Sequence, residues 1–215
     1  MKMVELNNIT KKYGKRVILN NLSFYVNEGE IISLVGPSGC GKSTILNMIG
    51  LLETYDRGEI KIKGNILPKI ESFKATRLRR NEINYLFQSY ALISDMTINQ
   101  NLLLAMYFLN MTEKIKQQKI DNILSRVGLF DLKHEFINTL SGGEQQRVAL
   151  VRTILKPGNI ILADEPTGSL DSQASDTVFR LLKKLCREYG KTAIIVTHDL
   201  TLASKTDRII ELEKL

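Results

Sequence analysis

Hydrophobic residues recur with two different periods along this 215-residue chain. In the first third, short apolar runs alternate with turns, so residues 18–26 and the β-branched run 31–35 are predicted to be strands. A further short strand with a turn is predicted over residues 58–64. Apolar positions at helical spacing after Ser43 predict a helix that ends near Gly50. The first third is therefore expected to be mostly sheet.

The middle of the chain, residues 89–156, has a helical period and few β-like runs. Its most apolar run, residues 102–109, is far shorter than the roughly 18 residues that cross a bilayer, so we expect a buried helix there. Ser141 and Glu144 have the spacing of a capping box, which predicts a helix from this point to Lys156. This region is therefore expected to be helical.

The last third returns to alternating strands and helices. Residues 160–163 and 192–197 are predicted to be strands, and residues 174–189 are predicted to form a helix between them. Such alternation builds a sheet with helices packed on it. The chain is therefore expected to be an α/β domain that is interrupted by a helical insertion.

Composition indicates which cellular compartment the chain occupies and whether the chain is globular. Hydrophobic residues make up 43% of the chain, which is typical of a folded globular protein. No apolar run is long enough to span a membrane and no signal-peptide core follows the first residues, so we expect a cytoplasmic chain that meets a membrane only through a partner. Cys40 and Cys186 have neither a metal-site spacing nor a disulfide framework, which fits a reducing compartment.

The net charge of +7 has more than one interpretation. A solvated basic surface is favoured over a face for anionic membranes or nucleic acid, because the lysines and arginines are scattered. The densest cluster, Arg77, Arg79 and Arg80, lacks the interleaved aromatic residues of a platform for single strands. We therefore expect no nucleic-acid partner.

The segment 36–43 has the spacing of a phosphate-binding loop, and it lies between a predicted strand and a predicted helix. Its glycines let the backbone curl so that N–H groups point at phosphate oxygens. Lys42 supplies a charge for the β- and γ-phosphates, and Ser43 supplies a hydroxyl for Mg²⁺. Because Cys40 lies inside the loop, we expect a bound nucleotide to shield its thiol. The residues expected to surround the nucleotide are Gly36, Pro37, Ser38, Gly39, Cys40, Gly41, Lys42, Ser43 and Thr44.

The apolar run 160–163 ends in two carboxylates, Asp164 and Glu165. Carboxylates at the end of a buried strand carry a high desolvation cost unless a cation lies beside them. Taken alone, the pair is simply a solvated strand end. In a chain with a phosphate loop, Asp164 is expected to hold Mg²⁺, directly or through water, and Glu165 to polarise the attacking water.

Residues 140–146 form a second phosphate-binding pattern at a predicted helix start. The pair Gly142 and Gly143 lowers helix propensity and leaves backbone amides bare, and bare amides at a helix start favour an anion. A simple capped helix is the alternative interpretation. The pattern has no evident task in the first nucleotide site, which indicates that a complete site forms only in a dimer. The residues expected to contact phosphate here are Ser141, Gly142, Gly143 and Glu144.

With these three motifs in this order, the chain resembles the ATP-binding cassette (ABC) ATPases over essentially its full length. The resemblance implies an α/β fold of the P-loop NTPase class, with an ABC-type ATPase core, an antiparallel β portion and an inserted helical sub-domain. It implies one domain over residues 1–215, with residues 1–88 and 157–215 as the nucleotide-binding core and residues 89–156 as the helical sub-domain. It also implies ATP and Mg²⁺ as cofactors.

The resemblance assigns roles to four further residues. Gln88 resembles a glutamine that senses Mg²⁺ and the membrane partner, and Asp171 resembles part of a loop that acts across the dimer. His198 resembles a switch histidine that contacts the γ-phosphate, and Tyr13 resembles an aromatic residue that stacks on adenine. Catalytic roles are thereby implied for Glu165, His198, Lys42 and Gln88, and metal-binding roles for Ser43, Gln88 and Asp164.

Finer similarity points to one branch of the family. Residues 47–52, 78–80 and 164–171 resemble the branch of macrolide-exporter and lipoprotein-releasing ATPases, and residues 86–93 are similar to its bacteriocin-export ATPases. Gln100 stands where this branch usually has glutamate, and the proline that usually precedes the second phosphate-binding pattern is absent. Both departures lie in the region that faces the partner, so they bear on the partner and leave the ATP chemistry intact.

The resemblance implies the ATP-hydrolysing subunit of an ABC transporter, acting as a homodimer that forms on ATP binding. Two copies sandwich two ATP–Mg²⁺ head to tail, and residues 141–143 of each copy complete the other copy's site. The implied partner is a separate integral membrane permease, which places the chain on the inner face of the cell membrane, and the implied activity is export of a peptide, antimicrobial or lipophilic substrate.

Two other function classes compete with this one. The alternative is an ATP-driven signalling or mechanotransmission subunit, used in cell-wall regulation or antibiotic sensing, that translocates nothing. A soluble ABC protein that acts on ribosomes or DNA is disfavoured, because the chain has one cassette and no long insert.

Overall fold

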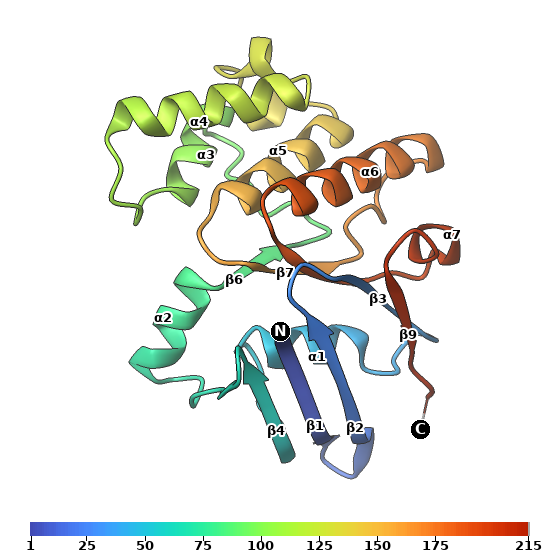
Figure 1. The fold of residues 1–215 in the computed structure, drawn as a ribbon. Helices are drawn as coiled ribbons and strands as arrows, with labels where there is room; N and C mark the ends of the chain where they lie inside the picture. The colour runs from blue at the N-terminus through green and yellow to red at the C-terminus, as the bar shows by residue number, and fades with distance from the viewer. Residues whose placement is uncertain (215) are drawn as a thin grey trace.

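The computed structural model describes residues 1–214, which fold into two sheets with helices between and above them (Figure 1). The first sheet is antiparallel and lies at the bottom of Figure 1. Alternate side chains of its first strand, among them Val4 and Leu6, face the interior and are fully buried. Its strands, in spatial order, are β2 Arg16–Asn27, β1 Lys2–Tyr13, β4 Arg57–Ile62 and β5 Asn65–Ile66.

The second sheet contains five parallel strands. They are, in spatial order, β6 Ile83–Leu86, β7 Ile160–Asp164, β8 Thr192–Val196, β3 Ile31–Val35 and β9 Arg208–Glu211. Every residue of β3 and β8 is buried, as expected for strands that are covered on both faces. Because parallel strands point the same way, the loops after β3, β7 and β8 leave the sheet at one edge, where ligands bind in open α/β sheets.

Helices cover both faces of the parallel sheet. The first, α1 Lys42–Ile49, lies between the two sheets, and its Ile45 packs in one core with Leu6 of β1 and Leu162 of β7 (Figure 1). On the other face, α5 and α6 lie next to the sheet, with α3 and α4 beyond them. The remaining elements are α2 Phe73–Asn81, α3 Ile98–Ala105, α4 Glu113–Arg126, α5 Gly142–Leu155, α6 Ser172–Glu188, α7 Leu200–Ala203 and 3₁₀ turns at Phe130–Leu132 and Ile137–Thr139.

Most of the sequence-based elements are confirmed. The predicted strands are present as β2, β3, β4, β7 and β8, and the predicted helices as α1, α5 and α6, each with bounds close to those expected. Ser141 and Glu144 form the expected capping box at the start of α5. The combination of an antiparallel sheet with a helix-covered parallel sheet confirms the predicted α/β class.

The apolar run 102–109 is not the buried helix that its composition predicts. The helix α3 ends at Ala105, and the side chains of Leu104, Tyr107 and Phe108 are 48%, 70% and 62% exposed. Only part of the run therefore packs in the core, and its aromatic end forms an exposed apolar surface. Within residues 1–214, no helix combines the length and the apolarity that a bilayer span requires.

Candidate functional site

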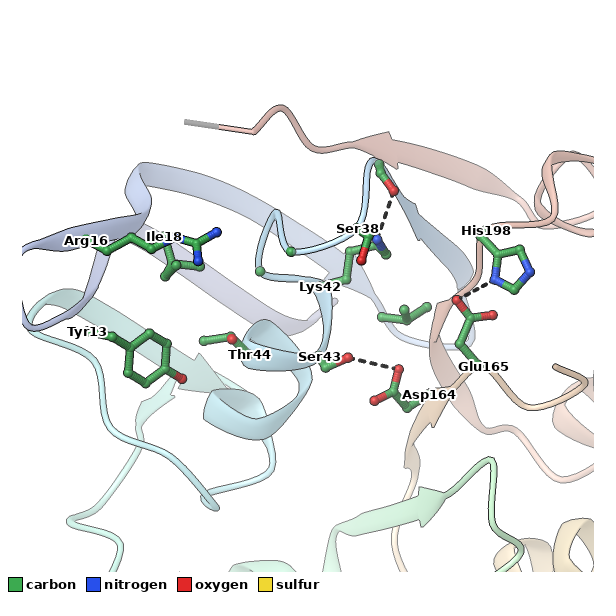
Figure 2. A pocket seen from close by; sticks show the side chains of 14 residues that line it. Tyr13, Arg16, Ile18, Ser38, Lys42, Ser43, Thr44, Asp164, Glu165 and His198 are labelled. Carbon is green, nitrogen blue, oxygen red and sulfur yellow. Dashed lines mark hydrogen bonds and ion pairs between the residues drawn. The ribbon is translucent and has the colours of Figure 1, made fainter. Parts of the chain in front are cut away.

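A cavity of about 540 Å³ opens at the edge of the parallel sheet where the predicted motifs meet (Figure 2). Its walls come from the β1–β2 hairpin, from the phosphate loop between β3 and α1, and from the loops after β7 and β8. The structure brings together these predicted residues around it: Tyr13, Gly36, Ser38, Gly39, Gly41, Lys42, Ser43, Thr44, Asp164, Glu165 and His198.

The sequence analysis missed Arg16 and Ile18, which also line this cavity (Figure 2). Both lie on β2, directly after the turn that follows Tyr13. Because β2 pairs antiparallel with the strand that ends at Tyr13, its first residues lie beside the same cavity. The hairpin was therefore the one sequence signal that could have indicated Arg16 and Ile18. Arg16 adds a cation near the loop, since its guanidinium lies 3.7 Å from the position that a Cβ on Gly39 would occupy.

The phosphate loop needs glycine at two close approaches. Gly36 and Gly41 have φ values of 150° and 101°, a region that other residues rarely adopt. A Cβ on Gly36 would lie 2.4 Å from the carbonyl oxygen of Leu212, and one on Gly41 would lie 2.9 Å from a side-chain carbon of Ile18. The loop is therefore held in its curled shape by β2 and by the segment after β9.

In this loop the Lys42 side chain faces the cavity, whereas the Cys40 side chain is buried in the core. The Lys42 ammonium donates hydrogen bonds to the carbonyl oxygens of Gly36 and Pro37, at 2.8 and 3.0 Å, and lies on the cavity side (Figure 2). The Cys40 side chain is 1% exposed and packs in the core beside α1. The expectation that nucleotide shields this thiol is wrong, because protein already covers it. Neither Pro37 nor Cys40 lines the cavity.

Two oxygen donors meet at the floor of the cavity. Asp164 ends β7, and its Oδ1 accepts a hydrogen bond from the Ser43 hydroxyl at 3.1 Å (Figure 2). Burial raises the pKa of Asp164 above its ordinary value, and the neighbouring charge of Glu165 adds to this, while the Ser43 hydrogen bond and Lys42 oppose it. A hydroxyl and a half-buried carboxylate in contact form the hard-oxygen pair that suits Mg²⁺.

Glu165 and His198 face each other across the ends of β7 and β8. The Glu165 backbone is left-handed, with φ of 45°, and its N–H donates to the carbonyl oxygen of Val196 at 3.0 Å. Its carboxylate oxygen Oε1 lies 2.9 Å from Nδ1 of His198 (Figure 2). The imidazole is mostly exposed, so its second nitrogen remains free to meet a ligand.

Tyr13 stands at the outer end of the cavity, away from the carboxylates (Figure 2). Its ring is half exposed, its hydroxyl donates to Glu53, and the Lys11 ammonium lies 4.8 Å from the ring centroid. A ring fixed in this way at one end of a cavity offers a flat surface on which a base can stack.

Gln88 does not line this cavity. It follows β6, and its Nε2 lies 3.0 Å from the position of a Cβ on Gly168, in the loop after Glu165. The structure therefore places Gln88 beside the carboxylate loop and outside the cavity itself.

The second phosphate-binding pattern also lies outside the cavity of its own chain. Ser141 caps α5, and the Glu144 carboxylate accepts hydrogen bonds from the Ser141 N–H and hydroxyl at 2.8 and 2.6 Å. These two hydrogen bonds, the hydroxyl first, lower the pKa of Glu144. The remaining amides at this helix start, including those of Gly142 and Gly143, are available to an anion.

One hydrogen bond connects this helix with the carboxylate loop, and a capping residue ends that loop at α6. The buried Gln146 amide donates a hydrogen bond to the carbonyl oxygen of Pro166, directly after Glu165. Asp171 caps α6, where its Oδ1 accepts from the N–H of Ala174 at 2.8 Å, and it lies outside the cavity. Movements of α5 are therefore tied to the segment that carries Glu165.

Comparison with known proteins identifies relatives of nearly the whole chain. Residues 19–168 match the family described as ABC transporter. The chain is 39% identical to the ABC transporter ATP-binding protein MJ0796 of Methanocaldococcus jannaschii, over 98% of this chain and 93% of that protein. It is 38% identical to the macrolide export ATP-binding/permease protein MacB of Escherichia coli over 98% of its length, and it spans about a third of that longer relative, 33%.

Solved structures agree with the sequence relatives. The dimeric structure of the MJ0796 cassette superposes with a TM-score of 0.85 at 38% identity, covering 98% of this chain and 94% of that one. A structure of the same cassette in a post-hydrolysis state bound to ADP and Pi has the same TM-score of 0.85 and covers 99% of this chain. The chain therefore belongs to the ABC transporter family, as one of its ATPase cassettes.

Proposed function

We propose that this chain binds ATP in the cavity beside the phosphate loop and hydrolyses it as half of a homodimer that drives a membrane transporter. One observation carries the proposal. A single copy gathers Lys42, Glu165 and His198 around one cavity but leaves the amides that follow Ser141 outside it. An anion-binding helix start that lies outside the cavity of its own chain fits the nucleotide of a second copy.

The cavity supplies a contact for each part of ATP. Tyr13 offers its ring to the base at one end, and the curled loop directs backbone N–H groups at the phosphates. The Lys42 ammonium, now hydrogen-bonded to loop carbonyls, moves onto the β- and γ-phosphates. Ser43 and Asp164 would hold Mg²⁺, which when bound neutralises charge that develops on the phosphates.

Glu165 and His198 provide the hydrolytic step. The Glu165 carboxylate orients and polarises a water for in-line attack on the γ-phosphate. His198 holds that carboxylate through Nδ1 and presents its other nitrogen to the γ-phosphate. Gln88, whose Nε2 lies beside Gly168, would supply its amide oxygen to a bound Mg²⁺.

The permease is expected to dock in a second concave surface, here called the docking groove. The groove has a volume of about 500 Å³ and lies between α2, β6, α3 and α5. Its exposed apolar residues Phe87, Leu104 and Phe108 stand beside cations, and the Arg80 guanidinium lies 3.9 Å from the Phe108 ring centroid. This chemistry fits an amphipathic segment with an acidic residue, supplied by the cytoplasmic side of a permease.

We further propose that the permease is a separate polypeptide and that the complex exports a peptide, antimicrobial or lipophilic molecule. The similarity to a macrolide exporter supports export. The chain would then lie on the inner face of the cell membrane. A substitution in the groove, Leu104→Glu, should release the tagged chain from the membrane fraction of its own cells, whereas Lys42→Ala should not.

The shared nucleotide site is tested by mixing two inactive variants. Lys42→Ala removes the phosphate contact, and Ser141→Arg fills the space where the other copy's γ-phosphate docks. Each variant alone should hydrolyse no ATP. An equal mixture should recover activity, since random pairing leaves about a quarter of the sites intact. A mixture as inactive as its components, with both proteins folded and dimerising, would contradict the shared site.

A further inference from the structure

Two consecutive residues after Gln88 have a strained backbone. Tyr90 and Ala91 have φ values of 62° and 51°, the left-handed region in which residues with a side chain are uncommon. Strained residues persist only where their surroundings hold them, and they gather at functional segments. Both residues lie in segment 89–100, which connects Phe87 and Leu104, two residues of the docking groove.

The surroundings that hold this pair come from α5. The guanidinium of Arg152 donates to the carbonyl oxygens of both Tyr90, at 2.9 Å, and Ala91. A guanidinium that binds two successive carbonyls fixes the direction of that backbone. The strained turn is therefore attached to the helix whose first residues carry the second phosphate-binding pattern.

The side chain of Tyr90 reaches the other end of the same helix. Its hydroxyl lies 2.9 Å from the Ser169 hydroxyl, in the loop between Glu165 and Asp171. It also lies 3.3 Å from the position that a Cβ on Gly142 would take. From Gly142 to Arg152 the helix rises about 15 Å, and the Arg152 and Tyr90 side chains together connect the strained turn with both ends of this stretch.

We propose that Tyr90 is a positioning residue whose hydroxyl fixes the positions of Ser169 and of the first turn of α5. A movement of segment 89–100 would then shift the α5 start against the ATP that the second copy binds. The inference rests on the proposed shared site, because the α5 start serves the partner's nucleotide. The Tyr90 hydroxyl meets α5 at Gly142, which lies outside the cavity of its own chain, so its effect through α5 should appear in trans.

The hydroxyl can be separated from the ring. The Tyr90 ring is partly buried against the core under α5, and Tyr90→Phe retains that packing. Tyr25→Phe is a matched control, since its ring lies on the antiparallel sheet beneath Lys2 and Arg208. Both variants should melt at the wild-type temperature and bind a fluorescent ATP analogue with the wild-type affinity.

The first measurement is dimerisation in a Glu165→Gln background, where ATP is retained. Tyr90→Phe should raise the dissociation constant of the ATP-bound dimer about tenfold, and Tyr25→Phe should not change it. Ser169→Ala should weaken the dimer as well, and the double variant should be no weaker than the single ones, since both remove one hydrogen bond. An unchanged dissociation constant for Tyr90→Phe, or additive effects of the two substitutions, would overturn the proposal.

The second measurement assigns the effect to one copy. In each mixed dimer of Lys42→Ala and Ser141→Arg proteins, one composite site is intact. The Ser141→Arg copy binds its ATP, and the Lys42→Ala copy supplies the α5 start. Tyr90→Phe should lower ATP turnover about fivefold or more when it is placed on the Lys42→Ala copy, and should leave turnover unchanged on the other. The reverse pattern would refute the inference. Failure of the unmodified mixture to hydrolyse ATP would count against the shared site, while the dimerisation measurement still decides the role of Tyr90.

Discussion

The Nδ1 atom of His198 lies 2.9 Å from Oε1 of Glu165, although the two residues follow different strands of the parallel sheet. The two strands, β7 and β8, are neighbours, so their ends present both side chains at one edge. The imidazole therefore holds the direction of the Glu165 carboxylate.

Replacing Glu165 by glutamine should separate ATP binding from turnover. An amide accepts a weaker hydrogen bond from water than a carboxylate does, so hydrolysis should fall about 10²- to 10⁴-fold. ATP affinity should remain, and the variant should elute as an ATP-dependent dimer in size-exclusion chromatography. Hydrolysis at the wild-type rate would move the role of base elsewhere, with His198 as the nearest candidate.

Removing the charge of Lys42 should affect both binding and chemistry. The Lys42→Ala variant loses the cation that the loop presents to the β- and γ-phosphates, so we expect weaker ATP binding and a fall in turnover of about 10²-fold or more. A coupled-enzyme assay measures turnover, and equilibrium dialysis measures binding. The exposed Lys119→Ala variant is a suitable control and should behave as wild type.

The thiol of Cys40 should resist labelling whether or not nucleotide is present. It is 1% exposed, and Cys186 is also buried, where burial raises the pKa of its thiol to about 12. A maleimide should therefore label neither cysteine until the chain is unfolded in urea. A Ser38→Cys variant places a thiol in the cavity, and it should react quickly and be protected by ATP. Mass spectrometry distinguishes the sites, and rapid labelling of Cys40 would show that the loop opens.

The stability of the chain should depend on Lys156 at alkaline pH. Burial, with nearby Lys191 and Arg152, lowers the pKa of Lys156 from 10.5 to about 8 in the folded state. Between these values the folded chain has lost the proton that the unfolded chain still binds, so the contribution of this group to the free energy of unfolding rises with pH. Relative to Lys156→Met, the wild type should gain stability from pH 8 to pH 10.5 in urea denaturation. A difference that is constant or falls with pH would contradict this assignment.

The sequence could predict where the chemistry gathers, because each motif follows a recognisable buried strand. The phosphate loop after β3, the carboxylates after β7 and His198 after β8 meet because parallel strands end at one edge. The direction of Cys40 could not be predicted in this way. It depends on φ and ψ angles that the flanking glycines allow, and these are set by contacts with β2 and the segment after β9.

The end of α3 and the position of Arg16 beside the cavity could not be predicted either, because both depend on tertiary contacts that hydrophobic periodicity does not indicate. The run 102–109 is uniformly apolar, but the helix stops at Ala105, and Phe108 beyond it lines the docking groove. A composition-based argument assigns apolar residues to the core and overlooks those kept for a partner. Arg16 was not predicted because its neighbourhood indicates only a hairpin, and a hairpin by itself indicates no ligand. Its role is visible only once the β1–β2 hairpin is folded against the loop.

Because the backbone of Glu165 is left-handed, selection for stability and selection for turnover favour different residues at position 165. Its φ of 45° would suit glycine, whereas a side chain there destabilises the fold by about 1 to 2 kcal/mol. Directed evolution for heat resistance alone, without a requirement for ATPase activity, should therefore favour small or left-handed-tolerant residues at 165. Comparison of the melting temperatures of Glu165→Gly and Glu165→Ala tests this, with the glycine variant expected to be at least as stable. A chain that keeps glutamate there retains the less stable backbone, as expected if the carboxylate has the proposed role in ATP hydrolysis.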